Sequence, residues 1–169
     1  MAADRRSSRL ADALILRPLV AADARELKRI HCTEEVRRWW SDPDDEFPWD
    51  DPDSTRWTVE VDGQIAGLIQ FQEECEPRYR HASVDLFLDP ARHGRGLGTE
   101  VLRRTVDHLV QERGHHRVTI DPAAENAAAI RCYEKAGFQR VGVMRAYERD
   151  ALGDEWHDGL LMEFVVQRA

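Results

Sequence analysis

Three glycines at alternate positions, Gly94, Gly96 and Gly98, follow an apolar alternating run that ends at Leu88 and open an amphipathic segment at Leu97. Glycine has no Cβ, so backbone N–H groups around it can converge on a small volume. The N-terminus of a helix adds a partial positive charge. A strand, a glycine loop and a helix in this order predict an anion site suited to a diphosphate. Glycines also simply permit tight turns, so the loop alone leaves both interpretations open.

A second motif follows downstream and reads Asn-x-x-Ala-Ile-x-x-Tyr-Glu-Lys-x-Gly-Phe from Asn126 to Phe138. Together the two motifs resemble the acetyl-coenzyme A site of the GNAT N-acetyltransferases. The resemblance covers residues 14–166 and implies acetyl-coenzyme A as co-substrate, with no metal. It implies that the following residues bind the co-substrate: Leu86, Phe87, Leu88, His93, Gly94, Arg95, Gly96, Leu97, Gly98, Thr99, Asn126 and Tyr133.

One position departs from the family pattern. The glycine-loop motif of GNAT proteins usually begins with Arg or Gln, and that position falls on His93 in this chain. The backbone contacts made possible by the glycines are unaffected. His93 either contributes to the co-substrate site or is an exposed loop histidine without a role.

Tyr133 follows Asn126 at close to two helical turns, so both side chains can face one groove. Acetyl transfer from a thioester releases a thiolate, whose thiol has a pKa of about 8.5. A nearby phenol can donate the proton, and the resemblance implies this catalytic role for Tyr133. The alternatives are a tyrosine packed under the sheet with its hydroxyl satisfied, and an Asn126 that acts only as a helix N-cap.

Two carboxylates are candidates for the acceptor side. Asp85 lies in the strand before the glycine loop, off its most apolar face. An acceptor amine must lose a proton before or during attack, and a carboxylate can take it directly or through water. Asp121 ends a neighbouring strand, where substrates collect in sheets of this kind. Asp85 could instead pair with a surface arginine, and Asp121-Pro122 could be a turn signal.

The placement of Asp85, Asp121 and Trp39-Trp40 in the sequence resembles that in the aminoglycoside 6′-N-acetyltransferases. In that family, carboxylates at the positions of Asp85 and Asp121 bind amines of the drug. The resemblance implies the same for Asp85 and Asp121. Adjacent tryptophans diverge on a helix, so one of the pair belongs to the core. Trp49 either stacks on a sugar ring or anchors its loop. The expected acceptor-binding residues are Trp39, Trp49, Asp85, Asp121 and Glu148, and the carboxylates of Asp150, Asp154, Glu155 and Asp158 either join them or are solvated.

The elements that position these residues follow from apolar periodicity and turn signals. Strands are expected over 14–16, 57–61, 65–71, 83–88, 118–120, 141–144 and 160–166. Helices are expected over 23–30, 36–40, 97–110 and 126–136, with Thr33 as a cap of the second and a polar hairpin-like insert between the last two strands. Asp62-Gly63 signals a hairpin.

This order predicts one GNAT-type α/β domain over residues 1–169, with 1–12 as a flexible tail. We expect a central, mostly antiparallel twisted sheet flanked by about four helices. The sheet is splayed between the strands that end near Leu88 and Asp121. Cys132 is expected to be buried, and His115-His116 to lie on the surface.

Composition limits the function classes. The chain has 169 residues, of which 42% are hydrophobic and 33% charged, which is typical of a globular domain. A net charge of −8 without a basic stripe argues against nucleic-acid binding. No apolar stretch is long enough to span a membrane, and the apolar run 13–16 is too short for the core of a signal peptide, so a cytoplasmic location is expected. The three cysteines show no CxxC spacing, which disfavours disulfides and zinc. The oligomeric state is unknown.

The resulting hypothesis is an acetyl-coenzyme A-dependent N-acetyltransferase that acts on the 6′-amine of an aminoglycoside and confers antibiotic resistance. Direct attack in a ternary complex needs no covalent enzyme intermediate. Acidic residues crowd the segment 42–53, which either attracts a polycation or is a solvated loop. The alternatives are acetylation of a protein N-terminus, a small amine or a polyamine, and a non-catalytic acyl-coenzyme A sensor.

Overall fold

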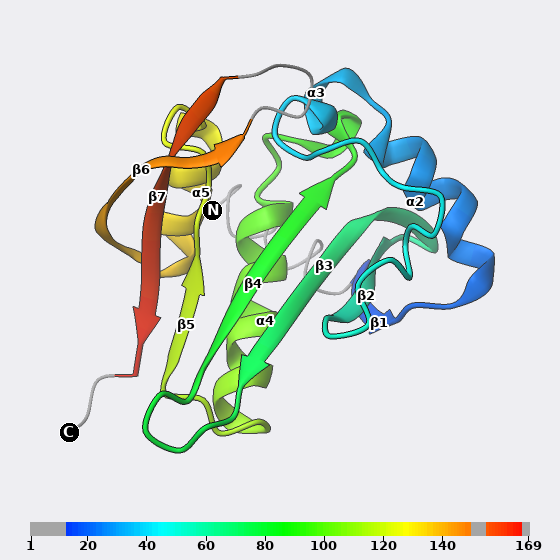
Figure 1. The fold of residues 1–169 in the computed structure, drawn as a ribbon. Coiled ribbons are helices and arrows are strands. Elements are labelled where there is room, and N and C mark those ends of the chain that lie inside the picture. Colours follow the sequence, from blue (N-terminus) through cyan, green and yellow to red (C-terminus); the bar gives the residue numbers. More distant parts are fainter. Residues whose placement is uncertain (1–12, 150–154, 167–169) are drawn as a thin grey trace, which may run out of the picture. The chain divides into compact units, whose positions relative to one another are not determined.

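The computed structural model describes residues 13–149 and 155–166 (Figure 1). The expected tail over 1–12, Asp150 and Asp154 lie outside the described residues. A seven-stranded sheet has the order β1-β2-β3-β4-β5-β7-β6. The strands are β1 (Leu14–Pro18), β2 (Thr55–Val61), β3 (Gln64–Glu74), β4 (His81–Leu88), β5 (Arg117–Ile120), β6 (Gln139–Arg149) and β7 (Trp156–Val165).

The helices in the described ranges are α2 (Ala24–His31), α3 (Glu34–Arg37), α4 (Leu97–Gln111) and α5 (Ala127–Ala136), with short 3-10 turns at Ala21–Asp23 and Pro90–Arg92. The predicted mixed sheet with four helices is thus confirmed. β1 and β2, β5 and β7, and β6 and β7 pair antiparallel, whereas β4 and β5 pair parallel. The β4–β5 register pairs Ala82 with Val118 and Ser83 with Thr119.

The chain divides into two compact units, the first with residues 13–70 and 86–101 and the second with 71–85, 102–149 and 155–166. In the first unit, one face of α2 buries Leu27 and Ile30 against Leu68 and Phe87. Complete burial of such side chains stabilises the fold by about 1.5–3 kcal/mol each. The β2–β3 hairpin turns at Asp62-Gly63, both with positive φ, as the sequence predicted.

A buried carboxylate, Asp23, fixes the start of α2 to the β1–β2 pair. It accepts hydrogen bonds from both Arg17 Nη atoms at 2.7 and 2.8 Å, from Thr58 Oγ1 at 2.7 Å and from the Val20 N–H at 3.1 Å. The Arg17 guanidinium, aided by the Thr58 and Val20 donors, holds the pKa of Asp23 at about 2. The ionised carboxylate is therefore part of the fold at neutral pH.

In the second unit, β7 lies between β5 and β6 (Figure 1). Its α5 helix begins and ends by the predicted signals. The Asn126 side chain accepts a hydrogen bond from the Ala129 N–H at 3.0 Å, and Gly137 closes the helix with φ of 107°.

Several local expectations are wrong. His115 is only 1% exposed rather than on the surface. Its Nε2 lies 2.7 Å from Glu73 Oε1, and Glu73 also accepts from Arg113. Cys132 is only partly buried. Thr33 stands at the N-cap of α3, but its hydroxyl donates to the Ile30 carbonyl instead of capping the helix.

The expected insert between the last two strands is also corrected. β6 continues to Arg149 and β7 begins at Trp156, so the strands take up much of the segment. The extra length brings Tyr147 and Glu148 into the sheet, and both matter for the candidate site.

Candidate active site

The glycine loop in the first unit has the backbone that the sequence predicted. Gly94 and Gly96 have φ of 73° and 82°, which favour glycine, and a Cβ built at either would meet nothing within 4 Å. The Glu100 N–H donates to the Gly96 carbonyl at 3.1 Å at the start of α4, and the N–H groups of the first turn of a helix point out of its N-terminus. Positive φ, open space and a helix N-terminus fit a diphosphate.

The strand that enters this loop is held closely by β3. A Cβ at Gly67 would collide with the Phe87 carbonyl and lie 2.9 Å from Leu88 Cα. Beyond the strand, the Asp89 N–H donates to the Ala66 carbonyl at 2.8 Å. His93 is exposed, with Nε2 3.1 Å from the Leu88 carbonyl oxygen. The loop therefore starts from a well-fixed strand end.

The second unit contains the proposed acid and base. Tyr133 is 7% exposed. Burial raises its pKa well above the ordinary value, and electrostatic interactions with Asp85, Cys132 and Asp121 raise it further. A phenol with a raised pKa stays protonated and can donate a proton. Asp85 is exposed on β4, as its alternation predicted.

Asp121 and Glu148 lie in the same electrostatic cluster. Glu148 is exposed on β6, yet desolvation of its carboxyl group and the Asp121 charge raise its pKa, and His157 opposes this effect. The Tyr147 hydroxyl hydrogen-bonds Asp121, which is the main cause that raises the Tyr147 pKa to about 12. The structure thus groups three predicted residues, Asp85, Asp121 and Glu148, around two tyrosines.

Sequence reasoning missed Tyr147. It stands in a stretch expected to be polar insert, and its contact with Asp121 depends on the β6–β7 pairing. Asp158, in contrast, has a structural role, because its carboxylate accepts a hydrogen bond from the Ala146 N–H at 2.8 Å. Glu155 is exposed.

The predicted tryptophans belong to the first unit. Trp40 packs against the core and lies edge-on to Phe87, with ring centroids 5.0 Å apart. Trp39 is half-buried beneath the Arg38 guanidinium at 4.9 Å, so the expectation that one of the pair is core is confirmed. Trp49 is 50% exposed, and its role on the acceptor side stays a prediction. Asn126, Tyr133 and the carboxylate cluster lie in the second unit, and the glycine loop in the first.

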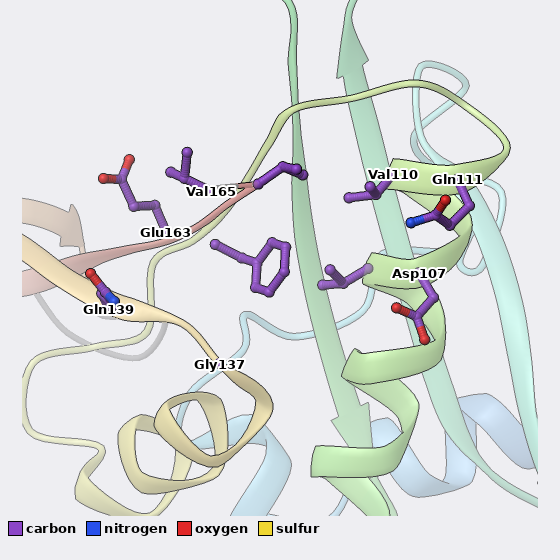
Figure 2. Close-up of a pocket in the computed structure, with 10 residues that line it drawn as sticks. Asp107, Val110, Gln111, Gly137, Gln139, Glu163 and Val165 are labelled. Atoms are coloured by element: carbon purple, nitrogen blue, oxygen red, sulfur yellow. The ribbon is translucent and has the colours of Figure 1, made fainter. Parts of the chain in front are cut away.

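A separate cavity of about 470 Å³ lies in the second unit between α4 and the segments around Gly137 and Val165 (Figure 2). Asp107 and Gln111 of α4 border it on one side, and Glu163 of β7 on the other (Figure 2). Its lining contains none of the predicted site residues. We therefore do not assign it to the active site.

Within the described ranges, no three His, Cys, Asp or Glu side chains are grouped so that they could hold a metal ion. No helix in the described part of the chain has the length and apolar character needed to cross a membrane.

Comparison with known proteins defines the class. The profile of the acetyltransferase (GNAT) domain matches residues 13–139. The chain therefore belongs to the GNAT acetyltransferase family. The co-substrate of this family is acetyl-coenzyme A, which the glycine loop fits.

Relatives with similar sequences include aminoglycoside, spermidine and mycothiol acetyltransferases. Aminoglycoside N(6′)-acetyltransferase type 1 of Klebsiella pneumoniae is 39% identical over 75 residues, which are 44% of this chain and 36% of that protein. The matched part thus spans about a third of that relative. Spermidine N(1)-acetyltransferase of Escherichia coli K12 is 28% identical over 137 residues, 75% of this chain and 73% of that protein.

Similar solved structures include aminoglycoside, spermidine and ribosomal-protein acetyltransferases. Aminoglycoside acetyltransferase AAC(6′)-Ib in complex with coenzyme A and kanamycin has a TM-score of 0.75 at 23% identity, over 90% of this chain and 95% of the other. Spermidine N-acetyltransferase of Vibrio cholerae in complex with coenzyme A and spermine has a TM-score of 0.78 at 21% identity, over 91% and 96% of the two chains. These likenesses confirm the fold.

Proposed function

We propose that this N-acetyltransferase transfers the acetyl group of acetyl-coenzyme A to the 6′-amine of an aminoglycoside and so confers resistance to the drug. The observation that carries the proposal is the carboxylate cluster of Asp85, Asp121 and Glu148, because several negative charges at one site favour an acceptor with several ammonium groups. We take residues 1–169 as a single catalytic domain and the cytoplasm as its location.

The donor side is assigned to the glycine loop and α5. Backbone amides from Gly94 to Thr99, at the N-terminus of α4, hold the diphosphate. By the family resemblance, we assign Leu86 to Leu88 of β4 to the pantetheine arm, and Asn126 as a further co-substrate-binding residue. When bound, the co-substrate supplies an acetyl thioester. Both partners held side by side react without the entropic cost of a free encounter.

Two side chains move protons. The Asp85 carboxylate, directly or through a water molecule, takes the proton that the acceptor ammonium must lose. The Tyr133 hydroxyl donates its proton to the departing sulfur. Burial of Tyr133 keeps the phenol protonated at neutral pH, so the donor is in the correct state before the acceptor arrives.

The remaining carboxylates select the acceptor. Asp121 and Glu148 bind ammonium groups that do not react, by charge-assisted hydrogen bonds. Trp39 and Trp49 are assigned to the acceptor side as apolar surface for a sugar ring.

A polyamine is the second candidate acceptor. The spermidine acetyltransferase match extends over 75% of this chain, compared with 44% for the Klebsiella aminoglycoside enzyme. A linear polyamine also carries several ammonium groups. The carboxylate cluster supports either acceptor, whereas an aromatic surface favours a sugar ring.

The test measures coenzyme A release with kanamycin, tobramycin, spermidine and a peptide panel. We expect release with the two aminoglycosides at lower concentration than with the other amines. Release with spermidine alone, or with peptides alone, would overturn the aminoglycoside assignment. Tight co-substrate binding without release for any amine would favour a non-catalytic sensor.

A further inference from the structure

The β6–β7 hairpin contains an irregular stretch next to the carboxylate cluster. Met144 pairs with Gly159, and Glu148 pairs with His157. Three residues of β6 therefore lie opposite Asp158 alone. A bulge of this kind bends the longer strand and redirects its side chains.

The bulge is fixed at Ala146 and turns Tyr147 over the neighbouring strand. Ala146 has φ of 47°, and its N–H donates to Asp158 Oδ1 at 2.8 Å. A Cβ at Gly159 would lie 2.7 Å from Tyr147 Cδ1 and 3.2 Å from Cγ. The Tyr147 ring therefore packs directly on the bare backbone of Gly159, and any larger residue there would displace it.

The segment that carries Asp121 is held on β7 by backbone hydrogen bonds. The Leu160 N–H donates to the Pro122 carbonyl at 2.8 Å, and the Ala124 N–H donates to the Asp158 carbonyl at 2.8 Å. The Tyr147 ring lies on Gly159, whose backbone pairs with Ala123, two residues after Asp121. This places the Tyr147 side chain at the Asp121 segment, and a side-chain hydrogen bond with Asp121 is the main cause that raises the pKa of Tyr147. Both ends of this contact are thus fixed by the fold.

We propose that Tyr147 is a positioning residue that holds the Asp121 carboxylate for a second, non-reacting ammonium group of the acceptor. One hydrogen bond from a phenol fixes the carboxylate and leaves its other lone pairs for N–H donors. Good acceptors therefore carry at least two ammonium groups, one that reacts near Asp85 and one that binds Asp121. The inference rests on the proposed acetylation of an amine, but it does not require that the amine belong to an aminoglycoside.

Steady-state kinetics of wild type, Tyr147→Phe and Gly159→Ala test this role, each with kanamycin, spermidine and the monoamine 6-amino-6-deoxyglucose. Tyr147→Phe keeps the ring packing and removes only the hydroxyl. Its KM for kanamycin should rise about three- to tenfold, the range of a typical net hydrogen bond. The kcat, the KM for acetyl-coenzyme A and the KM for the monoamine should stay nearly unchanged. Tyr79→Phe, an exposed tyrosine on the β3–β4 connection, is the matched control.

Gly159→Ala should raise the same KM, because the added Cβ displaces the Tyr147 ring. In the double variant the two increases should be less than multiplicative, since both act through one hydroxyl. An unchanged or lower KM for polycationic acceptors in Tyr147→Phe would overturn the inference, as would an equal change with the monoamine. If wild type acetylates spermidine and not kanamycin, only the aminoglycoside assignment fails, and the comparison is made with spermidine. If the protein acetylates neither kanamycin nor spermidine, both fail.

Discussion

Replacement of Tyr133 by phenylalanine should separate catalysis from binding. The change removes one oxygen and keeps the ring, which packs near Phe138 with centroids 6.5 Å apart. General acid catalysis contributes about 10²–10⁴ in rate. The variant should therefore lose turnover while its fold and its affinity for acetyl-coenzyme A stay close to those of wild type.

The environment of Tyr133 places the expected loss at the lower end of that range. Burial and the charges of Asp85 and Asp121 raise the phenol pKa well above its ordinary value. The thiol that forms has a pKa of about 8.5, so the phenol is the weaker acid, and proton transfer lags behind departure of the sulfur. We expect kcat to fall about 100-fold, which corresponds to about 2.7 kcal/mol in the barrier.

The assay combines single-turnover rates with calorimetric titration of acetyl-coenzyme A, and Tyr79→Phe again serves as the control. Because the Tyr133 pKa is raised, the phenol stays protonated at pH values where an ordinary tyrosine ionises. At any pH below about 10, loss of this proton should therefore cause no decrease in wild-type kcat. A kcat within about threefold of wild type, or an equal loss of co-substrate affinity, would contradict the acid role.

Three further predictions concern binding and stability. Gly96→Val should weaken acetyl-coenzyme A binding by at least about tenfold in calorimetry. The control Gly63→Ala also replaces a glycine that has a positive φ and open space around it, and it should leave binding unchanged. Equal losses of affinity in the two variants would show that backbone strain alone is responsible. Asp121→Asn should raise the KM for kanamycin about tenfold with little change in kcat, because the variant loses a charge-assisted hydrogen bond. An unchanged KM would show that Asp121 does not belong to the acceptor site. The pKa of Asp23 falls from 3.8 to about 2 on folding, so its contribution of roughly 2 kcal/mol is complete above pH 3.8 and is lost as the pH falls through 2. Urea unfolding of Asp23→Asn should therefore show this deficit at pH 7 and a smaller one at pH 2.5; a constant difference would refute the linkage.

Local signals in the sequence predicted much of the fold. The Asp62-Gly63 turn, the Asn126 cap and the Gly137 helix end each depend on a few neighbouring residues, and the structure confirms them. The exposed position of Asp85 also followed from strand alternation alone.

Contacts between distant residues escaped prediction. The burial of His115 depends on Glu73, 42 positions earlier in the chain. Tyr147 reaches Asp121 because the β6–β7 register forms a bulge at Ala146. Neither Glu73 as the partner of His115 nor the bulge at Ala146 has a signature in the neighbouring residues. The sequence therefore predicted that His115 lies on the surface and that a polar insert separates the last two strands.

The candidate site shows the same division. The glycine loop and Tyr133 stand in recognisable motifs, and both lie within the residues 13–139 that the family profile matches. The acceptor side is built from single carboxylates on different strands, whose grouping requires the folded chain. The identity of the acceptor amine therefore has to come from chemistry.

Product analysis tests the central claim most directly. Purified protein is incubated with acetyl-coenzyme A and kanamycin, and the drug is then examined by mass spectrometry and by NMR for the position of the new amide. We predict one added acetyl group, on the 6′-nitrogen, formed with equimolar release of coenzyme A. Unmodified kanamycin from protein that binds acetyl-coenzyme A in calorimetry, or an acetyl group on another nitrogen, would contradict the account.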